Sequence, residues 1–239
     1  MVGCKCNVCT SKDPRNKRRR ASVLISVNGK NLVIDTPPDF HEQALFCGLE
    51  RIDAVLFTHD HADHIFGLDE LRIFNFLQGG PIPIYAGKKT LARIQRLFDY
   101  IWDPDAPVGG GKPNLVAHSI NKAFKIEDIE VLPVEIYHGR QIIYGYRIGD
   151  FAYLTDCSGI PPKSRELLFG LKLLVIGALR YRPHPTHFSL AEALEEIARL
   201  APERALLTHL SHSFDYESTS QELPQGVELA YDGLVVEID

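Results

Sequence analysis

Potential metal ligands crowd into one short segment of the chain, directly after an apolar run. The segment reads Thr58-His59-Asp60-His61-Ala62-Asp63-His64 and follows a strand predicted at Asp53–Thr58. A helix cannot point three imidazoles and a carboxylate at one place with this spacing. A tight loop at a strand end can, because residues two apart in an extended chain project to the same side. The spacing therefore predicts a metal-binding loop.

Three later apolar, β-rich runs each end in a side chain of the same kind, namely His138, Asp156 and His209. Ligands at the ends of neighbouring strands are held by a rigid scaffold, as metal geometry requires. With the loop, the chain offers five histidines and two aspartates, enough for two metals. Nitrogen and carboxylate ligands suit Zn, Mn or Fe. The candidate ligands are His59, His61, Asp63, His64, His138, Asp156 and His209.

A second cluster lies at the start of the chain, where Cys4, Cys6 and Cys9 stand close together. The N-terminus lacks a signal-peptide core, and no apolar run approaches the ~18 residues of a membrane span. We therefore expect a cytoplasmic protein whose thiols stay reduced, so the clustering favours a metal over disulfides. Cys47 and Cys157 stand alone and are expected to pack as apolar side chains.

The net charge of -5 gives no global attraction to nucleic acid or to anionic membrane.

The order of predicted elements is strands, then alternating strands and helices, then more strands, which two sheets with helices outside would satisfy. At 239 residues without a visible linker, we expect one domain over 1–239, with a cysteine-rich segment at 4–9. A hairpin is predicted around Asn28-Gly29-Lys30, and a loop at Asp103–Asn114. Helices are predicted at Asp39–Leu49, Gly67–Leu77, Lys88–Ile101 and Ser189–Leu200. Strands are predicted at Ile82–Tyr85, Glu130–Tyr137, Ile142–Ile148, Phe151–Thr155, Lys172–Ile176, Arg204–Thr208, Val227–Ala230 and Leu234–Ile238.

The motif H-x-H-x-D-H, followed by an isolated His, an Asp and a final His, resembles the metallo-β-lactamase superfamily. The resemblance implies an α/β (α+β) fold, the αβ/βα four-layer sandwich of two mixed sheets with helices outside. It also implies that His59, His61 and His138 bind one metal and that Asp63, His64 and His209 bind the other. Asp156 would bridge the two metals.

The spacing Cys4-x-Cys6-x-x-Cys9, with His212 three residues after His209, is similar to the structural zinc site of one subfamily. These are cyclic phosphodiesterases related to the phosphoribosyl 1,2-cyclic phosphate enzyme of the phosphonate pathway. Three thiolates and one imidazole make a closed tetrahedral site with a structural role. Family members usually begin with a strand and a Gly/Thr-rich turn before the first Cys, whereas here only Met1-Val2-Gly3 precede it. A missing edge strand would leave the sheet with an unpaired neighbour, so either the start codon is misassigned or the edge is covered otherwise.

The same resemblance implies a phosphate-binding or proton-donating histidine at His187, just before a predicted helix whose N-terminus favours an anion. His184 could substitute for it. The catalytic residues are then Asp63, Asp156 and His187, and the expected reaction is attack on a small linear or cyclic phosphodiester by a hydroxide that bridges two Zn or Mn ions. The expected partner is this small phosphorylated substrate, without nucleic acid or membrane, and a homodimer is left open.

Other polar residues carry weaker expectations. Asp35 and Asp69 are candidates to orient the ligand imidazoles, or else capping or turn residues. The run Arg15–Arg20, with Arg72 and Arg180, would either contact phosphate or form a solvated face.

Two alternatives remain open at this point. A ribonuclease Z-type RNA endonuclease shares the histidine motif but normally has a long RNA-gripping arm and lacks the cysteine site. A non-catalytic binding protein, like the B protein of pyrroloquinoline quinone biosynthesis, has the cysteine site but an eroded catalytic site. Lactonase or thioesterase chemistry is also open. The diiron redox branch has Glu where His61 stands, which argues against oxygen chemistry.

Overall fold

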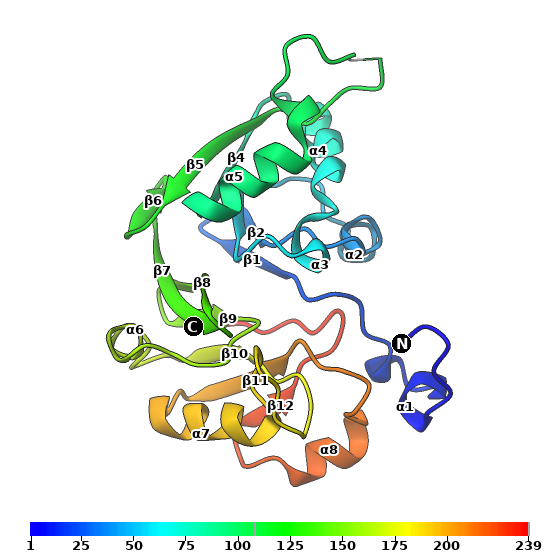
Figure 1. Ribbon diagram of the computed structural model, residues 1–239, viewed down its shortest axis with the longest axis vertical. Coiled ribbons are helices and arrows are strands. Elements are labelled where there is room, and N and C mark those ends of the chain that lie inside the picture. The colour runs from blue at the N-terminus through cyan, green and yellow to red at the C-terminus, as the bar shows by residue number, and fades with distance from the viewer. Residues whose placement is uncertain (108, 239) are drawn as a thin grey trace. The chain divides into compact units, whose positions relative to one another are not determined.

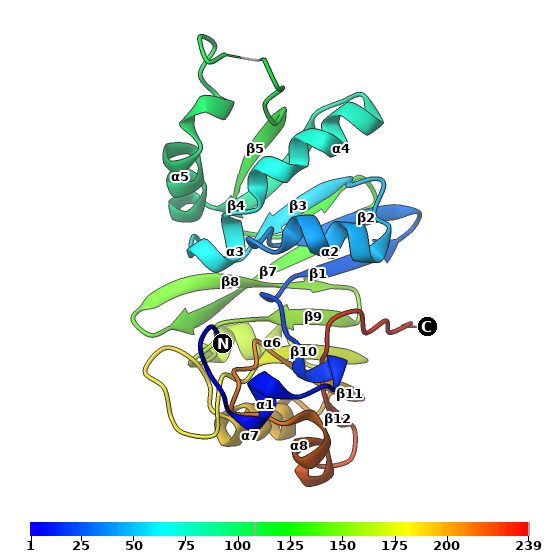
Figure 2. The ribbon, with the colours of Figure 1, turned by 90° about the vertical axis from the view of Figure 1, so that its right-hand side faces the viewer.

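Two mixed β-sheets with flanking helices make up the protein, as the predicted fold class requires. A computed structural model describes residues 1–107 and 109–238 (Figures 1 and 2). The chain forms two compact units, one of residues 20–130 and one of residues 1–19 with 131–239. The expectation of a single domain over 1–239 stays a prediction.

The sheet of unit 20–130 has the strand order β1-β2-β3-β4-β5. Strands β1 (Val23–Val27) and β2 (Lys30–Ile34) form the predicted antiparallel hairpin, and Asn28 and Gly29 both adopt the positive φ that a tight hairpin turn needs. The other pairs are parallel and add β3 (Ala54–Phe57), β4 (Ile82–Gly87) and β5 (Leu115–Ile120). Every residue of β3 is buried, as expected for a parallel strand covered on both faces.

Helices cover this sheet with apolar side chains. They are α2 (Phe40–Cys47), α3 (Ala62–Ile65), α4 (Leu71–Gln78) and α5 (Lys88–Leu97), with short 3-10 turns η2 (Leu68–Glu70) and η3 (Asp99–Ile101). Helix α2 ends at Gly48, which takes the left-handed conformation that glycine permits at a helix end. The core of the unit includes Phe57, Ile65, Leu68 and Ile84.

The sheet of the other unit runs in the order β12-β11-β10-β9-β8-β7. Strands β7 (Ile129–His138), β8 (Gln141–Ile148) and β9 (Phe151–Leu154) are antiparallel neighbours. Strands β10 (Leu173–Gly177), β11 (Arg204–Thr208) and β12 (Val227–Leu229) continue from β9 in parallel. The carboxyl ends of β9, β10 and β11 therefore lie side by side, and this edge carries the site residues described below.

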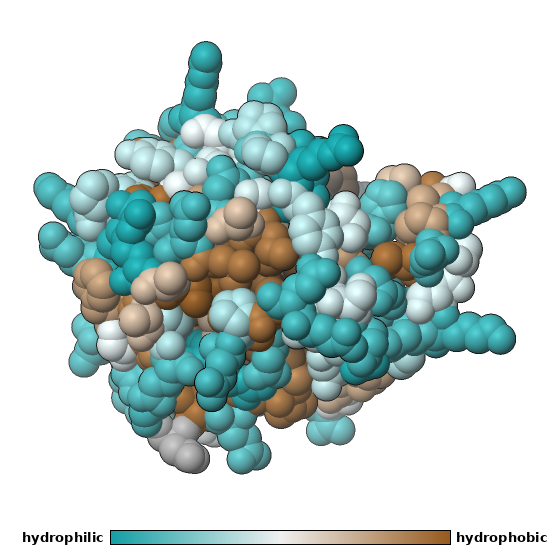
Figure 3. Space-filling model, turned by 90° about the horizontal axis from the view of Figure 1, so that it is seen from below, coloured by the Kyte–Doolittle hydropathy of each residue, from teal (hydrophilic) through white to brown (hydrophobic). Residues whose placement is uncertain are grey.

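The helices of this unit are α6 (Pro162–Glu166), α7 (Leu190–Leu200) and α8 (Tyr216–Glu222). The N-terminal segment contributes α1 (Asn7–Thr10) and the 3-10 turn η1 (Pro14–Asn16). Helix α7 begins with the predicted capping box, in which Ser189 and Glu192 each accept the other's backbone N–H. Figure 3 shows apolar side chains at the middle of the face seen from below, bordered by hydrophilic ones.

Most predicted elements are confirmed within one to three residues, and the differences have physical reasons. Strand β5 and the short strand β6 (Phe124–Ile126) were not predicted, because exposed polar residues such as His118 and Ser119 break the apolar pattern of β5. The strand predicted at Leu234–Ile238 is wrong: its residues join no sheet, and Val235 is 82% exposed. The predicted loop Asp103–Asn114 is confirmed except at Val108, which lies outside the described residues.

Among the described residues, no helix combines the length and apolarity needed to cross a bilayer.

Candidate metal centres

The segment after β3 gathers its imidazoles as its spacing predicts. We call His59, His61, Asp63 and His64 the histidine loop. The ring centre of His59 lies 4.5 Å from that of His61 and 4.2 Å from that of His64. His59 and His64 are buried, whereas His61 is exposed at the start of α3. Asp63 Oδ2 lies 3.7 Å from His64 Nε2. One short loop thus brings three imidazoles and a carboxylate to one place.

Asp35, at the end of β2, orients two of these imidazoles. Its Oδ2 accepts a hydrogen bond from His64 Nδ1 at 2.7 Å and another from Thr58 Oγ1 at 2.8 Å, while its Oδ1 accepts from the Thr58 amide at 2.9 Å. Thr58 Oγ1 in turn accepts from His59 Nδ1 at 3.0 Å. With both Nδ1 atoms so engaged, the Nε2 atoms are the ones that a metal would take. Complete burial raises the pKa of Asp35, and the charge of His64 opposes this shift.

Asp69 does not orient a ligand, so that candidate role is wrong. Its carboxylate accepts a hydrogen bond from the Tyr100 hydroxyl and lies 3.2 Å from Nη1 of Arg72. Burial and the neighbouring Asp69 raise the pKa of Tyr100. Asp69 lies in η2, beyond the turn that ends α3, and its side-chain partners are Tyr100 and Arg72. Arg72 is accordingly engaged in this ion pair.

The other unit brings together three side chains at the ends of its strands and one, His187, from the loop that precedes α7. We call His138, Asp156, His187 and His209 the strand-end cluster. Asp156 Oδ1 lies 2.9 Å from His187 Nε2 and 3.5 Å from His209 Nε2, and Asp156 Oδ2 accepts from Thr155 Oγ1 at 2.7 Å. Candidate ligand atoms of His138, Asp156 and His187 all lie within 4.8 Å of one another. Asp156 is 2% exposed and therefore almost completely buried.

His138 is oriented by backbone carbonyls instead of a carboxylate. Its Nδ1 lies 2.7 Å from the Asp156 carbonyl oxygen and 2.9 Å from that of Thr186. Because a carbonyl can only accept, Nδ1 carries the proton and donates. The Nε2 atom of His138 is therefore the available ligand atom, as in the histidine loop.

Three of the residues that follow strands adopt left-handed backbone angles, with φ of 63° at Asp35, 55° at Asp156 and 54° at His209. Asp and His tolerate this region better than most residues do, although it costs on the order of 1–3 kcal/mol each. Each of these residues turns the chain sharply where its strand ends. We infer that the turns aim Asp156 and His209 into the strand-end cluster and Asp35 towards His64 of the histidine loop.

His187 and His184 lie beside each other, with ring centres 4.9 Å apart. The pKa of His187 is lowered to about 4, chiefly by burial, while Asp156 raises it and the nearby histidines lower it. Burial, the Arg180 charge and His138 lower the pKa of His184, whose Nδ1 accepts from the Thr186 amide at 3.3 Å. Of the two, His187 is the one hydrogen-bonded to Asp156.

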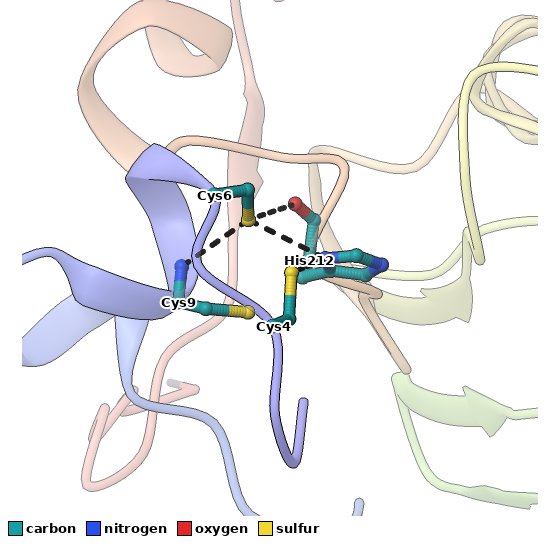
Figure 4. A group of neighbouring side chains, drawn as sticks. All are labelled: Cys4, Cys6, Cys9 and His212. Atoms are coloured by element: carbon teal, nitrogen blue, oxygen red, sulfur yellow. Dashed lines mark hydrogen bonds between the residues drawn. The ribbon is translucent and has the colours of Figure 1, made fainter.

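The predicted cysteine site is assembled from the N-terminal segment and the loop between β11 and α8 (Figure 4). We call Cys4, Cys6, Cys9 and His212 the cysteine site. Their ligand atoms lie within 4.8 Å of one another, and the sulfurs of Cys4 and Cys6 each lie 3.4 Å from His212 Nδ1. The pKa of Cys6 is lowered to about 6, first by the Cys9 amide and then by His212. Three sulfurs around one imidazole nitrogen fit a tetrahedral zinc ion.

Replacing His212 with alanine should remove one zinc per chain and lower the melting temperature by roughly 5 °C or more. A structural zinc site contributes several kcal/mol, and 1 kcal/mol corresponds to ~2–4 °C in a domain of this size. Elemental analysis and a thermal melt followed by circular dichroism measure the two effects. Cys47→Ser, which changes an exposed cysteine outside the site, is the control and should match the wild type. Unchanged zinc in His212→Ala would rule out the cysteine site.

Threonines next to the ligands are functional residues that sequence reasoning missed. Thr58, Thr155 and Thr186 bond to His59, Asp156 and His187 respectively. The available signal was that a threonine directly precedes each of His59, Asp156, His187 and His209.

Comparison with known proteins agrees with this architecture. Residues 30–210 match the family model of the beta-lactamase superfamily domain. A solved structure described as a new diphosphatase from the PhnP family is 42% identical, with a TM-score of 0.92 over 100% of this chain and 92% of that one.

Two curated relatives are longer than the chain. An octanoyltransferase of Porphyromonas gingivalis is 39% identical over 241 residues, which is all of this chain and 49% of that protein. A ribonuclease Z of Clostridium acetobutylicum is 29% identical over 59% of this chain and 48% of that protein. The chain spans about half the length of these relatives. The family match covers most of the chain and confirms the resemblance drawn from the motifs, so the chain belongs to the metallo-β-lactamase superfamily.

Proposed function

We propose that the protein is a metal-dependent hydrolase of small phosphodiesters. In this proposal the histidine loop and the strand-end cluster together supply the ligands of two divalent metals, zinc or manganese, with Asp156 shared between them. The ligand sets are those that the family resemblance implies. The cysteine site holds a separate structural zinc.

The observation that carries the proposal is the shared orientation of three of the five ligand imidazoles. In His59, His64 and His138 the Nδ1 atom is engaged by a threonine, a carboxylate or a carbonyl. Such partners fix the tautomer and ring angle of metal-binding histidines and raise their basicity. When bound, two divalent metals supply a water whose pKa is lowered towards neutrality and neutralise charge on the phosphate oxygens. The donor set therefore fits the metals that the family implies.

The chain's own residues account for the remaining chemistry. Thr155 and His187 hold the Asp156 carboxylate in one orientation. His187 presents Nε2 at this carboxylate, and we propose that it gives a proton to the departing oxygen of the substrate. A bound phosphate places negative charge beside the imidazole and so favours its protonated form.

A relative that matches over the full length of the chain supports a wider substrate class. The PhnP-family structure is described as a diphosphatase, so the proposed substrates include diphosphate diesters, in which a P–O–P bond is broken, besides simple and cyclic phosphodiesters. The octanoyltransferase name belongs to a protein about twice as long, of which this chain covers 49%.

A substrate panel on protein of known metal content tests the proposal. Bis-p-nitrophenyl phosphate, a five-membered cyclic phosphate, a diphosphate diester, an acyl thioester and a precursor tRNA would be offered side by side. We expect turnover of at least one small phosphodiester or diphosphate, and none of the thioester. Hydrolysis of the thioester alone would contradict the proposal.

Replacing His187 with alanine should slow substrates with poor leaving groups by roughly 10²–10⁴-fold. Substrates that release p-nitrophenolate should slow far less, because this leaving group departs without a proton. Steady-state kinetics on an alkyl phosphodiester and on a p-nitrophenyl phosphodiester measure the two rate reductions. The control is His41→Ala, which removes an exposed histidine paired with Glu70. Equal slowing of the two substrates would show that His187 does not protonate the leaving group.

Ribonuclease Z remains the second candidate, favoured by the match to the Clostridium protein. Turnover of the precursor tRNA in the substrate panel distinguishes a ribonuclease Z from a hydrolase of small phosphodiesters. Measuring the metal content distinguishes a non-catalytic binding protein from a hydrolase. About one zinc per chain would favour the binding protein, and about three metals per chain would favour the hydrolase.

A further inference from the structure

The run Arg15–Arg20 is not a uniform solvated face, because its arginines make different contacts. Arg15 pairs with Asp13, Arg19 with Asp232, and Arg20 with Asp39. Arg18 is half-buried and instead donates to backbone carbonyls. Arg18 is therefore held by the backbone of a segment that is distant in sequence.

The Arg18 guanidinium binds the backbone before and after the candidate ligand His212. Nη1 donates to the carbonyl oxygens of Ser211 at 3.1 Å and Phe214 at 2.8 Å. These two carbonyls lie on either side of His212. We call residues 209–216 the ligand loop, because it begins at His209 of the strand-end cluster and contains His212 of the cysteine site.

Neighbouring contacts make this attachment rigid. Nη2 of Arg18 donates to Asn16 Oδ1 at 3.3 Å, and the same oxygen accepts from the Tyr216 amide at 2.9 Å. The buried Asn16 also donates through Nδ2 to Asp215 Oδ2 at 2.9 Å. Within the ligand loop, Phe214 is fully buried, and the Ser211 amide donates to the Leu179 carbonyl at 3.0 Å. The segment 16–18 therefore binds the ligand loop through contacts other than those of the cysteine side chains.

We propose that Arg18 is a positioning residue that holds the ligand loop so that His209 faces Asp156. The inference rests on the proposed function, because it assigns His209 to a metal. A planar guanidinium can bind two carbonyls at fixed relative positions, which a lysine ammonium on a flexible stem does less well. His209 has φ of 54° and lies 3.5 Å from Asp156 Oδ1, a placement that a loosened loop would not keep. The ligand loop thus has two attachments, the cysteine site and Arg18.

The test compares Arg18→Ala and Arg18→Lys with Arg19→Ala, a matched control from the same run. Active-site metal affinity is measured by chelator competition, and zinc retention at the cysteine site by elemental analysis. We expect Arg18→Ala to keep the cysteine-site zinc and to lose about 10–100-fold in active-site metal affinity. Arg18→Lys should lie between it and the wild type, and Arg19→Ala should equal the wild type.

Rescue of metal affinity by an added ion distinguishes a positioning role of Arg18 from a general loss of stability in Arg18→Ala. Guanidinium ion at non-denaturing, millimolar concentration should restore part of the metal affinity of Arg18→Ala by occupying the space between the two carbonyls. Wild-type metal affinity in both Arg18 variants would overturn the proposal. If Arg18→Ala does not fold, Arg18→Lys decides: weaker metal binding at an unchanged melting temperature supports positioning, and unchanged binding overturns it.

Amide hydrogen exchange of the ligand loop keeps this proposal distinct from the proposed function. We expect residues 211–214 to exchange at least 10-fold faster in Arg18→Ala than in the wild type. If the wild type hydrolyses no phosphodiester but exchange and metal affinity change as stated, the proposed function fails and the role of Arg18 stands. If exchange in residues 211–214 is unchanged, the role of Arg18 fails whatever the enzyme hydrolyses.

Discussion

Asp156→Ala is expected to abolish turnover, with a loss on the order of 10³-fold or more, and to lower the active-site metal content. Asp156 is the carboxylate that the proposal shares between the metals, and it is held by Thr155 and His187 at the end of β9. Metal ions contribute several kcal/mol to the stabilisation of charge in such reactions, and ~4 kcal/mol corresponds to about 10³-fold in rate. Steady-state kinetics and elemental analysis on the same preparation measure both effects.

The control for this variant is Asp150→Ala. Asp150 lies in the exposed turn between β8 and β9, with its carboxylate 4.0 Å from Lys172 Nζ. It should retain wild-type turnover and metal content, because a solvent-exposed ion pair contributes little. Turnover within a few-fold of the wild type in Asp156→Ala would remove Asp156 from the proposed site.

Asp35→Ala is expected to cause the second largest effect, on both stability and metal binding. The change leaves the Thr58 amide, the Thr58 hydroxyl and His64 Nδ1 without the acceptor that they bond in a fully buried place. Breaking a buried pair in this way costs about 3–5 kcal/mol. Because the same carboxylate orients His64 directly and His59 through Thr58, active-site metal affinity should fall by roughly 10–100-fold. Denaturant unfolding and chelator competition give the two values.

Asp69→Ala is the matched comparison for Asp35, since both aspartates flank the histidine loop in sequence. Asp69 contacts Tyr100 and Arg72 instead of an imidazole. Its removal should leave metal affinity unchanged. If the two variants lost metal affinity equally, the orienting role of Asp35 would be wrong.

The sequence was most informative where the ligands are local or follow recognisable strands. The histidine loop could be predicted because its four side chains lie within six residues, and a strand end is the one local geometry that gathers them. His138, Asp156 and His209 could be placed at strand ends for the same reason. The spacing of the cysteines likewise indicated a metal site before its geometry was known.

Contacts between distant segments could not be predicted. Nothing near Arg18 in the sequence indicates that its partners are the carbonyls of Ser211 and Phe214, and backbone acceptors leave no residue signature. Asp35 and Asp69 were equal candidates by position, because only the fold decides which of them faces an imidazole. Leu234–Ile238 has the apolar content of a strand, but a strand also needs a partner that composition does not reveal.

Anomalous diffraction from crystals of the metal-loaded protein tests the central claim most directly. The account predicts three peaks per chain, one at the cysteine site and two that residues of the histidine loop and of the strand-end cluster would hold. The ligand atoms of His59, His64 and His138 should be Nε2, because their Nδ1 atoms are engaged elsewhere. A map with a peak at the cysteine site and none at His59, His138 or Asp156 would contradict it.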